Sequence, residues 1–197
     1  MRRVSQEELN KLLSKHDEFI ASNGKSGHYA YLANCDLSGL KFRGHNLQYL
    51  DFYDSNLENA DFSDCDIRNI SLNFANTDGI TMPDTPLQCP EFGEFVAYKK
   101  VLRGNKWLIA KLLIPADARR ISGLTPICRS DKAIVVHFEE MNGKIISQRY
   151  ATSWYDPSFI YRVGEEAVVD NFSENRWNDF APGIHFYTQK KEAVLFK

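Results

Sequence analysis

The sequence predicts a mainly β protein, in which a helix-capped, squared solenoid is followed by a compact β or α+β domain. Large apolar side chains recur at strict five-residue spacing between Leu32 and Leu72. This period fits neither a helix nor a flat strand, so the chain must turn a corner every five residues. Helical spacing of apolar residues precedes this segment, and strand-like runs separated by turn residues follow Glu94.

Residues 5–21 have the pattern of an amphipathic helix that covers the first coil of the solenoid. Ser5 and Glu8 form a capping box, and an Asn-Gly pair after the segment is a stop signal. A cover is expected because the ends of a solenoid expose backbone edges and apolar side chains. His16 lies on or beside the apolar stripe, and we interpret it as a half-buried core histidine rather than a ligand.

The predicted core of the solenoid is formed by the side chains at the five-residue spacing, because these point inward. These residues are Leu32, Leu37, Phe42, Leu47, Phe52, Leu57, Phe62, Ile67 and Leu72. An Asp or Asn repeatedly precedes the central residue, where its side chain can hydrogen-bond the turn backbone. Thr77 breaks the apolar series, so we expect the solenoid to end near Gly79.

Written in fives, the segment reads AYLAN, CDLSG, LKFRG, HNLQY, LDFYD, SNLEN, ADFSD, CDIRN, ISLNF, ANTDG. It resembles the pentapeptide-repeat family, whose unit is A(D/N)LXX. The resemblance implies a short right-handed quadrilateral β-helix with four pentapeptides per coil, so that residues twenty apart stack. The resulting domain prediction is a capping helix and entry at 1–29, the repeats at 30–79, a Pro-rich linker at 80–93 and a β-rich domain at 94–197.

Composition limits the classes of protein and site. The sequence contains no run of eighteen apolar residues, so it predicts no membrane span. Its N-terminus lacks the apolar region of a secretory signal. The four cysteines form no CxxC pair, so we predict no metal site, no cofactor and a cytoplasmic location. Residues 30–79 hold eight acidic and three basic residues, whereas 90–197 hold thirteen acidic and sixteen basic ones. This split is either ordinary solvated surface or a sign that the two halves meet different partners.

The C-terminal half predicts two hairpins and further short strands. Residues 94–114 contain the turn RGN, and residues 132–153 contain the turn NG, between strand-like runs. Pro115 at a first helical position favours a short helix over 115–120. Further strands are expected at 158–163, at 183–187 and, closest to the C-terminus, at 192–196.

This half also resembles a domain of unknown function that follows pentapeptide repeats in phage and some bacterial proteins. The matching stretches are AYKKV, LLIPADARR, CRSDKAIV, SWYDPSFIYRVGE and GIHFYTQKKEAV. Residues 179–182 stand where family members often carry a Glu-Cys pair, so thiol chemistry at that position is absent here. The resemblance implies an architecture and a phage-like setting, with the host cytoplasm as the location if the chain is phage-encoded. It implies no activity.

The candidate ligand-binding residues combine cations with aromatic rings, which suit a phosphate-bearing or nucleotide-like ligand. They are Tyr98, Lys99, Arg120, Arg129, Tyr161 and His185. The alternative is that these side chains satisfy buried carbonyls and carboxylates. Cys128 lies beside Arg129, whose positive charge would favour a nucleophilic thiolate. The motifs GxSxG, HExxH and GxxxxGK[ST] are absent, so no catalytic residue is assigned.

We therefore expect a non-enzymatic binding protein whose C-terminal domain recognises a host protein or a phosphorylated small molecule. One alternative is a small enzyme that acts on a nucleotide-like substrate through His185, Tyr161 and Arg129. Another follows from the resemblance, because some pentapeptide-repeat proteins mimic DNA and inhibit topoisomerases. The repeats would extend only about 12 Å, against about 34 Å for one turn of DNA. Membrane and direct nucleic-acid binding are not expected, and an oligomer or an assembly role stays open.

Overall fold

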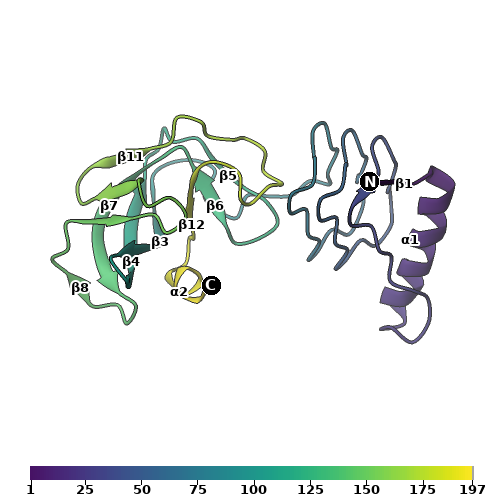
Figure 1. Ribbon diagram of the computed structural model, residues 1–197, viewed down its shortest axis with the longest axis horizontal. Coiled ribbons are helices and arrows are strands. Elements are labelled where there is room, and N and C mark those ends of the chain that lie inside the picture. The colour runs from purple at the N-terminus through teal and green to yellow at the C-terminus, as the bar shows by residue number, and fades with distance from the viewer. Residues whose placement is uncertain (197) are drawn as a thin grey trace. The chain divides into compact units, whose positions relative to one another are not determined.

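The computed structural model describes residues 1–196, which divide along the chain into two compact units, one ending at Pro86 and the other beginning at Leu87 (Figure 1). The protein is mainly β, with one long helix near its N-terminus. No helix among residues 1–196 has both the length and the apolar character needed to cross a membrane.

Helix α1 (Gln6–Ala21) begins at the predicted capping box. The Ser5 hydroxyl accepts a hydrogen bond from the backbone N–H of Glu8, at 3.2 Å. The buried face of α1 includes Leu9, Leu13 and His16. His16 is completely buried rather than half-buried, because the helix packs it directly onto the repeats.

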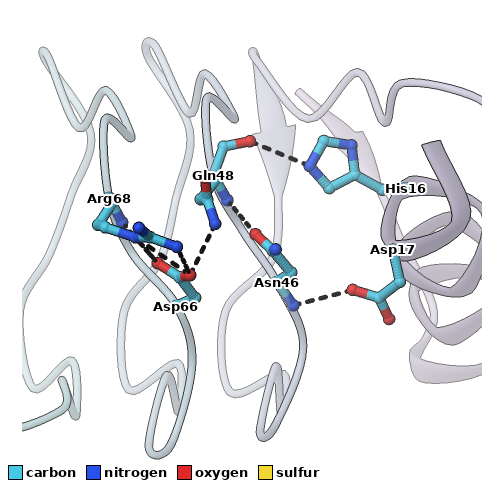
Figure 2. Close-up of polar contacts among 6 residues, drawn as sticks. All are labelled: His16, Asp17, Asn46, Gln48, Asp66 and Arg68. Atoms are coloured by element: carbon cyan, nitrogen blue, oxygen red, sulfur yellow. Dashed lines mark hydrogen bonds and ion pairs between the residues drawn. The ribbon is translucent and has the colours of Figure 1, made fainter. Parts of the chain in front are cut away.

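Polar contacts fix α1 against the repeats (Figure 2). His16 Nε2 lies 3.1 Å from the carbonyl oxygen of Gln48, and an Asp17 carboxylate oxygen accepts from the backbone N–H of Asn46 at 2.8 Å. Before the helix, strand β1 (Arg2–Arg3) pairs in parallel with β2 (Cys35–Asp36). The N-terminal segment therefore covers the first repeats with both backbone and side-chain partners.

The repeat segment returns to lie beside itself after every twenty residues. Parallel bridges join Asp36 to Asn56, Asn46 to Asp66 and Asp61 to Thr81, among others. The nine core side chains named above are all buried. Since the last bridge includes Thr81, the pairing runs slightly beyond the end expected near Gly79.

The second unit contains one large sheet and one small one. The large sheet has the strand order β10-β9-β3-β4-β7-β11, with β8 on β7, and the small sheet has the order β12-β6-β5. The strands are β3 (Phe95–Arg103), β4 (Lys106–Ile114), β5 (Arg120–Ser122), β6 (Cys128–Ser130), β7 (Lys132–Glu140), β8 (Ile145–Ile146), β9 (Tyr150–Thr152), β10 (Ile160–Arg162), β11 (Glu166–Val168) and β12 (Ile184–Phe186). The hairpin predicted at 94–114 is present as β3–β4. The hairpin predicted at 132–153 is present only beside its turn, as β7–β8, because residues 150–152 form β9, which pairs with β3 and β10.

Two local predictions are wrong. Residues 115–119 form no helix, because the Arg120 guanidinium binds the carbonyls of Pro115 and Ala116 and the segment curls around it. Most of the residues expected as a strand at 192–196 instead form part of helix α2 (Lys190–Leu195). Its residues are good helix formers, and Ala193 packs onto the sheet in a small apolar cluster with Ile109.

Candidate binding surface of the C-terminal unit

Four of the six predicted ligand-binding residues come together inside the second unit. Lys99 on β3 donates a hydrogen bond from Nζ to the carbonyl oxygen of His185 on β12, at 2.9 Å. Its Nζ also lies 5.8 Å from the ring centroid of Tyr161 on β10. Arg129 on β6 stands directly opposite His185 in the antiparallel β6–β12 pair. Strand pairing thus unites residues that are far apart in sequence.

Burial controls the protonation of this cluster. It lowers the pKa of Lys99 to about 8. Burial, with a smaller contribution from the Lys99 charge, lowers the pKa of His185 to about 4. Burial also raises the pKa of Tyr161. At neutral pH, His185 and Tyr161 are therefore uncharged, while most Lys99 side chains carry their proton.

The polar groups of the cluster are used within the protein. The Arg129 guanidinium donates to the carbonyl oxygens of Ser173, Pro182 and Asn175. His185 Nε2 lies 2.8 Å from the carbonyl oxygen of Asp179. These bonds fasten the loop at 173–182 to the small sheet. They match the alternative reading, in which Arg129, Lys99 and His185 satisfy buried carbonyls.

The other two predicted residues lie elsewhere. Arg120 donates to five carbonyl oxygens, including that of Gly93, and its guanidinium carbon is 5.2 Å from the Phe95 ring centroid. Tyr98 exchanges backbone hydrogen bonds with Tyr187 and packs in the small apolar cluster of α2. Neither residue joins the Lys99 cluster.

Cys128 has no features of an activated nucleophile. It is completely buried. A hydrogen bond with the Cys89 thiol, together with burial, raises the pKa of Cys128, so the thiol keeps its proton. Among residues 1–196, no group of three or more His, Cys, Asp or Glu side chains is placed to hold a metal ion.

A different set of aromatic and cationic side chains faces solvent at the β3–β4 hairpin and β9. We call it the Trp107 surface, and it consists of Lys100, Arg103, Trp107, Tyr150 and Trp154. The Trp107 and Trp154 ring centroids are 6.1 Å apart, and Lys100 Nζ is 4.9 Å from the Trp107 ring. The Arg103 guanidinium carbon lies 3.8 Å from the Tyr150 ring centroid. Trp154 is 52% exposed.

Strand register explains how this surface assembles. Leu102 on β3 is paired with Trp107 on β4 and with Thr152 on β9. The aromatic side chains that flank these positions are therefore carried by three adjacent strands and the loop after β9. Because side chains alternate along a strand, Lys100 and Trp107 share one face of the sheet, whereas Arg103 starts from the opposite face at the end of the hairpin. Within the described chain, Arg103 forms no ion pair, whereas Lys106 beside it is paired with Glu140 at 2.6 Å. Arg103 thus keeps donors for an external anion.

Comparison with known protein families bears on both units. Eight pentapeptide repeats are matched over residues 30–69. Residues 85–193, more than half of the chain, match a family of unknown function (DUF5758). The chain belongs to the DUF5758 family. Searches of curated proteins and of solved structures found no match.

The DUF5758 segment contains every candidate residue discussed above, both in the Lys99 cluster and on the Trp107 surface. Sequence reasoning missed most of that surface, because strand pairing across β3, β4 and β9 was not assigned. One signal was present: Trp154 and Tyr155 stand together shortly before Pro157, in a segment that reads as a loop. Tyr155 is 86% exposed. Two adjacent exposed aromatic residues in a loop are typical of a binding surface.

Proposed function

We propose that this DUF5758 protein is a non-enzymatic binding protein, and that its C-terminal unit recognises a phosphate-bearing, nucleotide-like ligand through the Trp107 surface. The observation that carries the proposal is the contrast between two arginines. Arg129 donates its hydrogen bonds to internal carbonyls, whereas Arg103 lies exposed beside the Tyr150 ring and has no ion-pair partner in residues 1–196.

The chemistry of the Trp107 surface suits both parts of such a ligand. A guanidinium binds phosphate through two parallel hydrogen bonds, and Tyr150 orients Arg103 from one side. The exposed Trp154 ring offers a face on which a base can stack, and such stacking contributes roughly 1–3 kcal/mol. Lys100 is held in place by the carbonyl oxygen of Phe196, at 2.7 Å, and adds positive charge.

Titration calorimetry with nucleoside mono-, di- and triphosphates, nucleosides and inorganic phosphate tests the proposal. We expect binding of the phosphorylated compounds, weakened at least tenfold by Arg103→Gln and by Trp154→Ala. The matched control is Arg119→Gln. Arg119 also lies over a ring, 5.1 Å from the Phe172 centroid, but Asp131 neutralises it. Equal weakening by Arg119→Gln would point to unspecific charge attraction and contradict the proposal.

An acidic segment of a host protein is the other ligand considered for this unit. The same titrations with a glutamate-rich peptide distinguish it from a nucleotide. Tight peptide binding with no response to any nucleotide would replace the small-molecule assignment. A phage setting and a cytoplasmic location stay predictions.

The enzymatic alternative is motivated by one observation, the partly buried Lys99 with a pKa of about 8 beside His185. Perturbed pKa values are common at active sites and also occur in structural networks. Phosphorus NMR of the nucleotide mixtures separates the two functions. We expect no turnover; hydrolysis that Lys99→Met abolishes without unfolding the protein would identify an enzyme.

For the repeats we propose the right-handed quadrilateral β-helix implied by their family. The proposal is supported by bridges between residues twenty apart, such as Asp51 with Ser71, and by the contact between the rings of Phe42 and Phe62. DNA mimicry by this segment stays a weaker proposal, because an extent of about 12 Å covers only a third of a DNA turn. A topoisomerase supercoiling assay with the purified protein would reveal such inhibition.

A further inference from the structure

We propose that one side of the repeat segment is a docking surface for a cationic, arginine- or lysine-bearing segment of a partner protein. This tyrosine face consists of Tyr31, Tyr49, Asp51, Tyr53, Asp54 and Phe74. It lies in the first unit and is independent of the ligand proposed for the Trp107 surface. Three features support the proposal: exposed rings in contact, backbone conformations unusual for aromatic residues, and carboxylates without cations.

The exposed rings of the tyrosine face fall into two groups, one around Tyr29 and one formed by Tyr53 and Phe74. Tyr31 is 80% exposed, Phe74 63% and Tyr49 57%. Tyr29 connects two of them, since its ring centroid is 5.1 Å from that of Tyr31 and its hydroxyl donates to the carbonyl oxygen of Tyr49. The Tyr53 and Phe74 centroids are 5.4 Å apart. Clustered exposed aromatic side chains are typical of protein interfaces.

Two of these aromatic residues occupy backbone positions that disfavour them. Tyr49 and Phe74 stand at corners with φ of 65° and 60°, in the left-handed region. The other left-handed corners of the repeats carry residues that tolerate this conformation, namely Asn34, Gly39, Gly44, Asp54, Asn59, Asp64, Asn69 and Gly79. Because most of the area of both rings is exposed, burial in this unit offsets little of the backbone cost. Such outliers concentrate at functional surfaces.

The charges of the tyrosine face specify the chemistry of the partner. Asp51 and Asp54 lie on the same side as the rings, and neither forms an ion pair with any residue in the range 1–196. The basic residue at the neighbouring corner, Arg68, forms an ion pair with Asp66, in which Nη2 and Oδ2 are 2.6 Å apart (Figure 2). Aromatic faces attract guanidinium and ammonium groups, and carboxylates bind the same groups through charge-assisted hydrogen bonds. Nucleic acid and other anions are repelled by the same carboxylates.

Fluorescence anisotropy with the full-length protein tests this assignment. The probe is a labelled Gly-Arg repeat peptide, with a Gly-Glu repeat peptide and a labelled DNA single strand as comparisons. We expect the Arg peptide to bind, with affinity reduced at least fivefold by Tyr53→Ala and by Asp54→Asn, and neither variant should change any binding of the other two probes. The matched control is Asp64→Asn, which changes an exposed carboxylate at an equivalent left-handed corner of another side. Circular dichroism verifies that each variant is folded.

The outcomes are decisive in both directions. Loss of binding in the two tyrosine-face variants, with the control unchanged, supports the docking surface. Equal loss with Asp64→Asn shows attraction to the overall acidic charge of the repeats and overturns it. Binding of the Glu peptide or of DNA that Tyr53→Ala weakens overturns the cationic partner. A dimer, detected by light scattering, that Tyr53→Ala dissociates would make a second copy of this chain the occupant instead.

Discussion

Phe42 and Phe62, twenty residues apart in the sequence, pack ring against ring with their centroids 4.4 Å apart. The Phe52 ring joins them, at 5.8 Å from Phe42 and 5.4 Å from Phe62. All three side chains are completely buried. The strict five-residue period thus places one aromatic cluster at the centre of the repeat segment.

We predict that Phe62→Ala destabilises the protein by about 3–5 kcal/mol, because it leaves a cavity between two rings. Tyr31→Ala removes an exposed ring and should change the free energy of unfolding by no more than about 0.5 kcal/mol. Urea denaturation of both variants measures the difference. Similar losses in the two variants would contradict the assigned core.

A second prediction concerns two glycines with similar backbone conformations, Gly27 (φ 76°) and Gly39 (φ 69°). A Cβ atom at Gly27 would lie 2.4 Å from the carbonyl oxygen of Lys15 in α1, whereas one at Gly39 would meet open space. Gly39→Ala should therefore lower the free energy of unfolding by only about 1–2 kcal/mol, the cost of placing a residue with a Cβ atom in the left-handed conformation. Gly27→Ala should cost clearly more, because the entry to the repeats must move away from the helix. Thermal denaturation measures both variants. A larger decrease in melting temperature for Gly39→Ala than for Gly27→Ala would contradict the close packing of Gly27 against α1.

The His185 pKa predicts acid sensitivity. Its ordinary value is 6.5 and burial lowers it to about 4. Below pH 6.5 the unfolded chain binds a proton that the folded protein does not accept until about pH 4. Stability should therefore decrease between these values, by roughly 3 kcal/mol in total. In His185→Gln this part of the pH dependence should vanish, while the exposed-site variant His28→Gln should keep it. Denaturation midpoints between pH 7 and pH 4 provide the measurement.

A fourth prediction separates a structural arginine from a binding arginine. Arg129→Met leaves three carbonyl oxygens without their donor and should destabilise the second unit by roughly 3 kcal/mol. Arg103→Met removes an exposed side chain and should leave stability nearly unchanged while abolishing ligand binding. A large loss of stability in Arg103→Met, with binding kept, would reverse the two assignments.

Much of the fold follows from local patterns. The capping box at Ser5, the five-residue period and the turns at Gly104 and Gly143 each act over a few residues, so sequence alone predicts them. Segment 115–119 was mispredicted as a helix because its conformation depends on the guanidinium of Arg120, which binds its carbonyls. The pairing of β9 with β3 was also out of reach, because the two strands are far apart in sequence; β9 pairs in addition with β10, the next strand along the chain.

The candidate site shows the same limit. Residue type drew attention to Lys99, Arg129, Tyr161 and His185 as candidates for ligand binding, and strand pairing brings them together. Their burial and their internal partners depend on the loop at 173–182, whose path carries no periodic signal. Exposure, which distinguishes Arg103 from Arg129, is a property of the tertiary fold and not of residue type.

The most direct test of the central claim uses the indole N–H signals of the chain's three tryptophans in a nitrogen-edited NMR titration with adenosine triphosphate. The Trp107 and Trp154 signals should shift and saturate together. Trp177 is the internal control, because Arg176 also lies over its ring, at 4.6 Å, but outside the Trp107 surface. A shift of the Trp177 signal alone, or no shift at any indole at millimolar ligand, would contradict recognition by the Trp107 surface.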